Sequence, residues 1–166
     1  MPTAIPDLWP SEASALDVLS PLAIARFQAS QLRQRTGGLL EAEVQLSGES
    51  SKWNQASFDV IAPPLDRYRM ELFRMGYSGQ KPYPVNVYSE NLCGEAVHSG
   101  FLWADPGTDE FTPEPDYDHA VASSQEEFIQ LLTLVFASRR TRSILQSMLA
   151  RINETRLQAD PATSTQ

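Results

Sequence analysis

Three side chains of this sequence could support thiol or imidazole chemistry: Cys93, His98 and His119. A catalytic thiol needs a base within hydrogen-bonding distance. Cys93 and His98 are five residues apart, so on a strand they would point to opposite faces. His119 could reach Cys93 only through tertiary folding. No local motif therefore indicates a nucleophile, and the favoured interpretation of Cys93 is a half-buried, small apolar side chain.

Carboxylates are concentrated in residues 105–118, where they could offer oxygen ligands to calcium. The six are Asp105, Asp109, Glu110, Glu114, Asp116 and Asp118. The segment lacks the alternating ligands, turn glycine and distal glutamate of an EF-hand, so a solvated acidic loop is favoured. Phosphate-binding glycine loops, Gly-x-Ser-x-Gly and His-Glu-x-x-His are also missing from the sequence. We therefore predict no metal, cofactor or catalytic residue, which favours a non-enzymatic protein over an enzyme without deciding between them.

Positive charge is densest towards the C-terminus, where it could bind an anion, a nucleic acid or carboxylates of the protein. The residues are Arg139, Arg140, Arg142, Arg151 and Arg156. The net charge of −8 opposes non-specific attraction to phosphates. No aromatic residues alternate with these arginines to form a base-stacking platform. Pairing with acidic residues of this chain or of a second copy is favoured, and no nucleic-acid partner is predicted.

Length and composition indicate one soluble globular domain. The chain has 166 residues, of which 42% are hydrophobic and 20% charged. The first residues lack the basic and apolar regions of a signal peptide, and the longest strongly apolar run, Leu131–Ala137, is far shorter than the roughly 20 residues that span a membrane. The single cysteine precludes an intrachain disulfide and suits a reducing compartment. We expect a cytoplasmic protein without membrane association.

Residues 39–88 are predicted to form consecutive strands, because apolar and polar residues alternate along them. In the clearest example, the core-facing residues Tyr68, Met70 and Leu72 alternate with the water-facing residues Arg67, Arg69 and Glu71. The alternation slips near Phe73, which predicts a β-bulge or a strong local twist. Similar patterns predict strands in residues 40–46, 58–62 and 83–88, and residues 96–103 are a candidate fifth strand. The short connections favour antiparallel neighbours.

Three helices are predicted to flank these strands. Ser20-Pro21 caps the first, which should end near Thr36 because Gly37-Gly38 follows. Serines at 123–124 and Ser138 are predicted to cap the other two. The predicted fold is α+β: an antiparallel meander of four or five strands, with an N-terminal helix and two C-terminal helices packed on one face. Residues 1–154 form one domain in this prediction, and residues 155–166 form a C-terminal tail.

Two hypotheses of function follow. In the first, the protein associates with itself or with a protein partner, for example in an immunity- or antitoxin-like role. The candidate interaction face is the polar face of the sheet, formed by Glu41, Glu43, Asp59, Arg67, Arg69 and Glu71. In the alternative, a pocket between the sheet and the helices serves a small-ligand-binding or enzymatic domain. The candidate pocket residues are Tyr68, Cys93, His98, Phe101 and Trp103.

The order of several short motifs resembles that of small bacterial accessory proteins carried on mobile gene cassettes. The motifs lie within residues 18–152: Ser20-Pro21-Leu22-Ala23-Ile24, Phe27-Gln28-Ala29, Glu41-Ala42-Glu43-Val44, Tyr83-Pro84-Val85, Glu126-Glu127-Phe128 and Thr141-Arg142-Ser143-Ile144-Leu145. The resemblance implies a bacterial cytoplasmic protein. It implies no activity and no catalytic residue.

Overall fold

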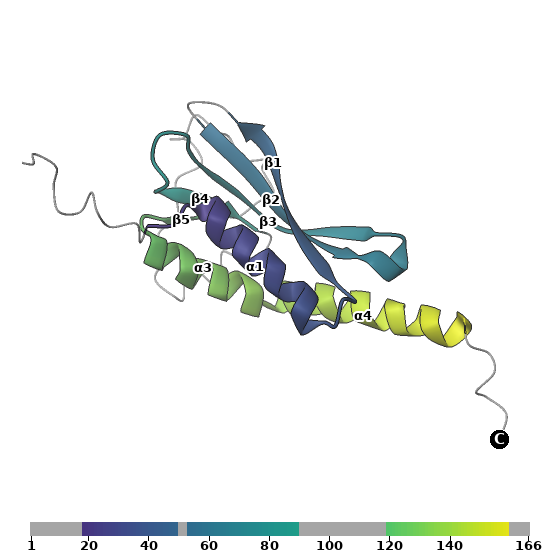
Figure 1. Cartoon of the computed structure of the whole chain (residues 1–166). Helices are drawn as coiled ribbons and strands as arrows, with labels where there is room; N and C mark the ends of the chain where they lie inside the picture. Colours follow the sequence, from purple (N-terminus) through teal and green to yellow (C-terminus); the bar gives the residue numbers. More distant parts are fainter. Residues whose placement is uncertain (1–17, 50–52, 90–118, 160–166) are drawn as a thin grey trace, which may run out of the picture.

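The structure is a computed structural model that describes residues 18–49, 53–89 and 119–159. Its elements are α1 (Pro21–Arg35), β1 (Glu41–Glu49), β2 (Trp53–Ala62), the 3-10 turn η2 (Pro63–Leu65), β3 (Tyr68–Ser78), β4 (Val85–Tyr88), β5 (His119–Ala122), α3 (Gln125–Ala137) and α4 (Arg139–Ala159). The strands form one antiparallel sheet in the order β1-β2-β3-β4-β5 (Figure 1). The predicted α+β class is confirmed.

Helix α1 begins and ends where its capping residues predict. The Ser20 hydroxyl accepts a hydrogen bond from the Ala23 backbone N–H at 3.2 Å, and Pro21 occupies the first helical position. At the other end, Gly38 has a φ of 82°, a conformation that glycine adopts with little strain. The Gly38 N–H donates a hydrogen bond to the Arg33 carbonyl. The helix therefore stops before β1. Phe27 is exposed, because it lies opposite the buried Ala25 and Ala29 on the helix.

The predicted bulge in β3 is confirmed. Phe58 of β2 pairs with Phe73, whereas Asp59 pairs with Glu71, so Leu72 is the extra residue. The bulge changes which residues of β3 face the helices: Leu72 is buried and so are Phe73 and Met75 beyond it. A single irregularity thus lets both halves of this long strand contribute to one core.

Two side chains donate hydrogen bonds to backbone carbonyls at the bulge. The Leu72 carbonyl accepts from the Ser89 hydroxyl at 2.9 Å and from Arg140 Nη1 at 3.0 Å. The same Arg140 atom lies 3.2 Å from the Glu71 carbonyl oxygen. Arg140 thus contacts backbone carbonyls and connects the start of α4 to the bulge.

Replacing Arg140 with methionine should destabilise the domain by roughly 1.5–3 kcal/mol, because two part-buried carbonyls lose a charged donor while the apolar stem is kept. Thermal or urea unfolding measures the effect. Arg139→Met is the matched control, since Arg139 is an exposed neighbour and should change stability by less than about 0.5 kcal/mol. Equal losses in the two variants would contradict a role for the guanidinium at the bulge.

The core lies between one face of the sheet and the three helices (Figure 1). At its centre the Phe58 and Phe73 rings are stacked with centroids 5.0 Å apart, and Phe136 of α3 meets the Phe58 ring edge-on at 5.4 Å. Buried side chains of α1 and α4 join the same cluster, including Ala25 and Ile152. The predicted packing of all three helices on one face is confirmed.

The C-terminal helices begin at the predicted serines. The Ser124 hydroxyl accepts from the Glu127 N–H, while Glu127 accepts from the Ser123 N–H at 2.6 Å. Ser138 caps α4 by accepting from the Thr141 N–H at 3.1 Å. Helix α4 then continues through Ala159, past the point at which the composition predicts a tail.

The fifth strand is β5, which the sequence does not reveal. Its four residues, His-Ala-Val-Ala, do not alternate between apolar and polar side chains. The candidate strand in residues 96–103, with Phe101 and Trp103, lies outside the described residues.

Pro84 precedes β4, and the Tyr83–Pro84 peptide bond is cis. Because β4 lies between β3 and β5, Pro84 marks a strand beginning and not an edge strand.

Tyr83 makes the stability of the folded domain sensitive to alkaline pH. Its hydroxyl donates to the Leu19 carbonyl at 2.9 Å, and burial, followed by the charge of Glu126, raises the pKa of Tyr83 to about 12. The unfolded pKa is about 10. The folded state therefore holds the proton more tightly, so this contribution is complete below pH ~10 and is lost as the pH rises towards 12. Urea unfolding at pH 9 and pH 11 should show a smaller fall in stability for Tyr83→Phe than for the wild type. Parallel falls would contradict the assignment.

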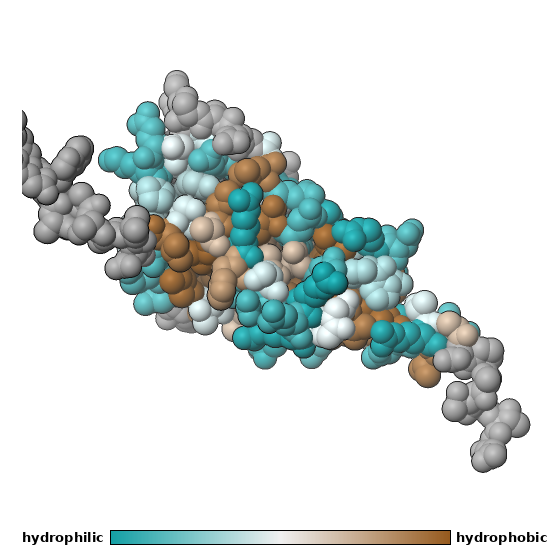
Figure 2. All heavy atoms as spheres, in the orientation of Figure 1, coloured by the Kyte–Doolittle hydropathy of each residue, from teal (hydrophilic) through white to brown (hydrophobic). Residues whose placement is uncertain are grey.

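Apolar side chains do not form one continuous surface on the side shown in Figure 2, where separate brown patches are divided by teal side chains. The large apolar residues that remain exposed are Val18, Leu19, Phe27, Leu46, Tyr68, Ile129 and Leu157. Within the described ranges, no helix has both the length and the apolar character to cross a membrane.

Candidate functional site

The six residues of the predicted interaction face come together on β1, β2 and the beginning of β3. Glu43, Asp59 and Glu71 lie directly opposite one another across the three strands. Three carboxylates in such a row repel one another unless cations offset them. The arginines of the same face supply that charge.

Arg69 bridges two of the three carboxylates. Its Nη2 lies 2.6 Å from Glu43 Oε2, and its Nη1 lies 3.0 Å from Asp59 Oδ2. The Ser57 hydroxyl is 3.4 Å from the same Asp59 oxygen. The guanidinium therefore connects β1, β2 and β3 through charge-assisted hydrogen bonds.

The remaining charges of the face are also paired. Arg74 Nε is 2.9 Å from Glu71 Oε2, across the bulge. Glu41 lies 3.7 Å from Arg33 of α1 and 4.0 Å from Arg67, in contacts that are longer and more exposed. Arg67 itself has a φ of 55°, as does Asp66 before it, so the turn into β3 is tight. All six residues therefore have an oppositely charged partner, and the two contacts of Arg69 join different strands.

Two orientations differ from the prediction. Asp59 projects from the polar face but is only 5% exposed, so it does not face water. Its burial is compatible with charge because Arg69 and Ser57 contact it. Tyr68, predicted to face the core, is 40% exposed: it lies at the first position of β3, where Arg151 of α4 covers its ring only in part.

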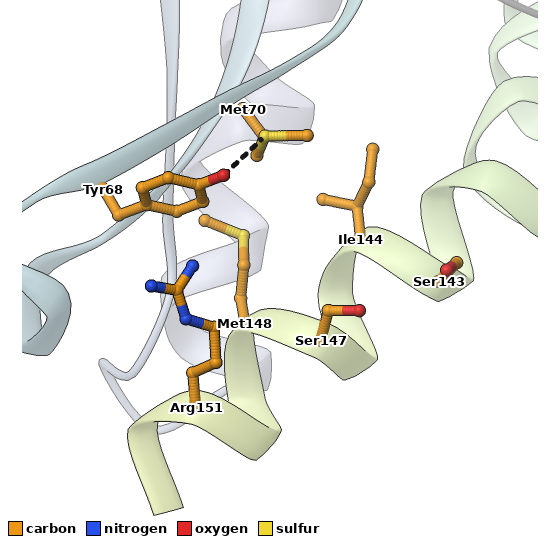
Figure 3. Close-up of a pocket in the computed structure, with 7 residues that line it drawn as sticks. All are labelled: Tyr68, Met70, Ser143, Ile144, Ser147, Met148 and Arg151. Carbon is orange, nitrogen blue, oxygen red and sulfur yellow. Dashed lines mark hydrogen bonds between the residues drawn. The ribbon is translucent and has the colours of Figure 1, made fainter. Parts of the chain in front are cut away.

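Tyr68 nevertheless lines a pocket between β3 and α4 (Figure 3), with a volume of about 270 Å³. The lining residues are Tyr68, Met70, Ser143, Ile144, Ser147, Met148 and Arg151. The other four candidate pocket residues, Cys93, His98, Phe101 and Trp103, lie outside the described residues. The six residues other than Tyr68 were not foreseen as a pocket, although the four-residue spacing of Ser143, Ser147 and Arg151 is visible in the sequence.

The other candidates for imidazole chemistry and metal binding are His119 and the acidic segment 105–118. His119 is buried in β5, where its ring lies 5.0 Å from that of Tyr88. The acidic segment 105–118 lies outside the described residues. Among the residues that the structure describes, no group of three or more His, Cys, Asp or Glu side chains is arranged to hold a metal ion.

The edges of the sheet are β1 and β5, of which β1 is the longer at nine residues. The helix-facing row of β1 is covered only in part: Ala42 and Val44 are half-buried, and Leu46 is 41% exposed. In β2, by contrast, Phe58 and Val60 are fully buried. Among the described strands, none pairs with the outer edge of β1, which presents apolar side chains beside its backbone groups.

The class defined by this fold is an α+β domain in which one antiparallel sheet carries three helices on a single face. No protein-family model matches the chain, and comparison with curated proteins and with solved structures gave no match.

Proposed function

We propose that this chain is a non-enzymatic interaction protein that associates with a second copy of itself by pairing the outer edges of the two β1 strands. The observation that carries the proposal is the long edge strand with a partly uncovered apolar row. Strand edges of this kind pair readily with another strand, and a two-fold axis makes such pairing self-limiting.

The residues of β1 favour one antiparallel register. With Val44 on the two-fold axis, Glu43 lies opposite Gln45 of the second copy, Ala42 opposite Leu46, and Glu41 opposite Ser47. No like charges then face each other, and the apolar residues share one side of the joined sheet. Centring the pair on Glu43 would oppose two glutamates, and centring it on Gln45 would oppose Glu41 to Glu49.

The pairing is short, because the β1 register against β2 shifts between Leu46 and Gly48. The paired segment is therefore limited to residues 41–47. An interface of this size belongs to the weak, concentration-dependent class. A heterologous strand, such as one from a partner in an immunity- or antitoxin-like complex, could add to the same edge by the same backbone hydrogen bonds.

Charge changes at Gln45 test the register. Gln45→Lys should strengthen association, because two lysines would each face Glu43 of the other copy, and Gln45→Glu should weaken it. Gln45 is exposed, so neither change should alter folding by more than about 0.5 kcal/mol. Sedimentation equilibrium over a wide concentration range gives the association constants.

The matched controls are Gln146→Lys and Gln146→Glu on the exposed side of α4, which change the net charge equally away from β1. They should leave association nearly unchanged. Identical shifts at positions 45 and 146 would show that net charge alone acts and would overturn the register. A protein that stays monomeric but co-purifies with another chain would replace self-association by heterologous binding. A monomer without any partner would overturn the interaction function itself.

A further inference from the structure

The pocket between β3 and α4 is built from two adjoining stripes of the helix. Ser143, Ser147 and Arg151 recur every four residues and so share one side of α4. Ile144 and Met148 form an apolar stripe beside them. Figure 3 shows Tyr68 and Met70 of β3 facing this helix surface across the pocket. The result is a cavity with a polar side and an apolar side.

The polar side offers hydrogen-bond donors that have no acceptor among the described residues. Among the described residues, Arg151 has no carboxylate partner, and its guanidinium carbon lies 4.9 Å from the centre of the Tyr68 ring. This stacking holds the side chain in place while leaving its N–H groups available. No carboxylate lines the pocket.

The two serine hydroxyls are available as well. In these helices Thr133 and Thr155 donate to the carbonyls four residues earlier, at 2.9 Å and 3.0 Å. Ser143 and Ser147 make no such bond within the part of the chain that the structure describes. The Tyr68 hydroxyl donates to the Met70 sulfur at 3.3 Å, and this sulfur is a weak acceptor.

We propose that this pocket binds a small monocarboxylate with a compact apolar body. Arg151 and Ser147 donate hydrogen bonds to the carboxylate, since a guanidinium and a hydroxyl on one stripe suit its two oxygens. Met70, Ile144 and Met148 contact the apolar body, and the flexible methionines adapt to its shape. The volume of about 270 Å³ lies just below the range of roughly 300–1,000 Å³ for drug-sized ligands, so the ligand is small.

The site rests on the pocket geometry and is independent of the pairing of β1. Arg151 gives the pocket a positive charge, and its described lining residues include no acidic group, although the protein as a whole carries a net charge of −8. Contacts within the pocket, and not the electrostatic field of the whole protein, would therefore attract an anionic ligand to this position.

Titration of the full-length, ¹⁵N-labelled protein with benzoate and, separately, hexanoate tests the proposal by nuclear magnetic resonance. At least one of the two should shift the amide signals of residues 68–70 and 143–151 in a saturable way. The corresponding neutral amide, benzamide or hexanamide, should bind roughly tenfold more weakly, because it loses the charge-assisted bonds. Arg151→Gln should abolish this preference for the acid.

Arg142→Gln on the same helix is the matched control, because Arg142 is exposed and does not line the pocket. It should leave both affinity and selectivity unchanged, and melting curves should show that both variants fold. Three results would each overturn the proposal: no saturable shift with either acid, equal affinity for acid and amide, or shifts spread over all the arginine-rich surfaces.

Discussion

Replacing Leu72 with aspartate is expected to leave the domain unfolded or insoluble under native conditions. Leu72 is 2% exposed and belongs to the core between sheet and helices. Removing a buried leucine side chain costs roughly 2–5 kcal/mol. An unpaired carboxylate in the same place adds the cost of burying a charge. The sum exceeds about 4–5 kcal/mol, which is comparable to the whole stability of many domains.

Circular dichroism and urea unfolding measure this effect, and two variants separate its causes. Leu72→Ala removes only the packing and should remain folded with the smaller loss. Leu157→Asp makes the identical chemical change at a leucine that is 78% exposed, and its effect should stay within about 0.5 kcal/mol. Similar melting temperatures for the two aspartate variants would show that Leu72 is not part of the core.

Reversing the charge of Arg69 is expected to be the second most damaging change, at roughly 2–4 kcal/mol. From sequence alone, Arg69→Glu should leave folding nearly intact if the residue faces water. The structure confirms that Arg69 is partly exposed but gives it two carboxylate partners, one of them the buried Asp59. The substitution leaves Asp59 without its cation and places a fourth carboxylate beside Glu43 and Glu71.

Two comparisons make the Arg69 prediction specific. Arg67→Glu makes the same change two residues away, where the ion pair with Glu41 is exposed and 4.0 Å long, so its cost should stay below about 1 kcal/mol. Arg69→Gln removes the cation without adding a charge and should fall between the two. Raising the salt concentration to 1 M should restore part of the stability lost by Arg69→Glu, since it screens like charges. Equal melting temperatures for Arg67→Glu and Arg69→Glu would refute the bridging role.

Local signals in the sequence determined most of the elements. Ser20-Pro21 and Ser138 mark helix starts because each cap bonds to backbone within the next three residues. Alternation along residues 39–88 predicted four of the strands, and its slip near Phe73 predicted the bulge. These features depend on residues that are close together in the sequence, so the sequence alone predicts them. Their antiparallel pairing followed from the short connections.

Only the tertiary structure decided which distant groups meet. Asp59 and Arg69 are ten positions apart and pair because β2 and β3 align across a bulge whose register no local pattern specifies. Arg140 reaches the Leu72 carbonyl, and Arg151 reaches Tyr68, because α4 packs across the beginning of β3. Whether a charge is free or paired, and whether an aromatic ring is buried or forms a pocket wall, depends on contacts between segments far apart in the chain. Periodicity reports the direction of a side chain from its own strand or helix, but the packing of the whole domain determines what that side chain meets.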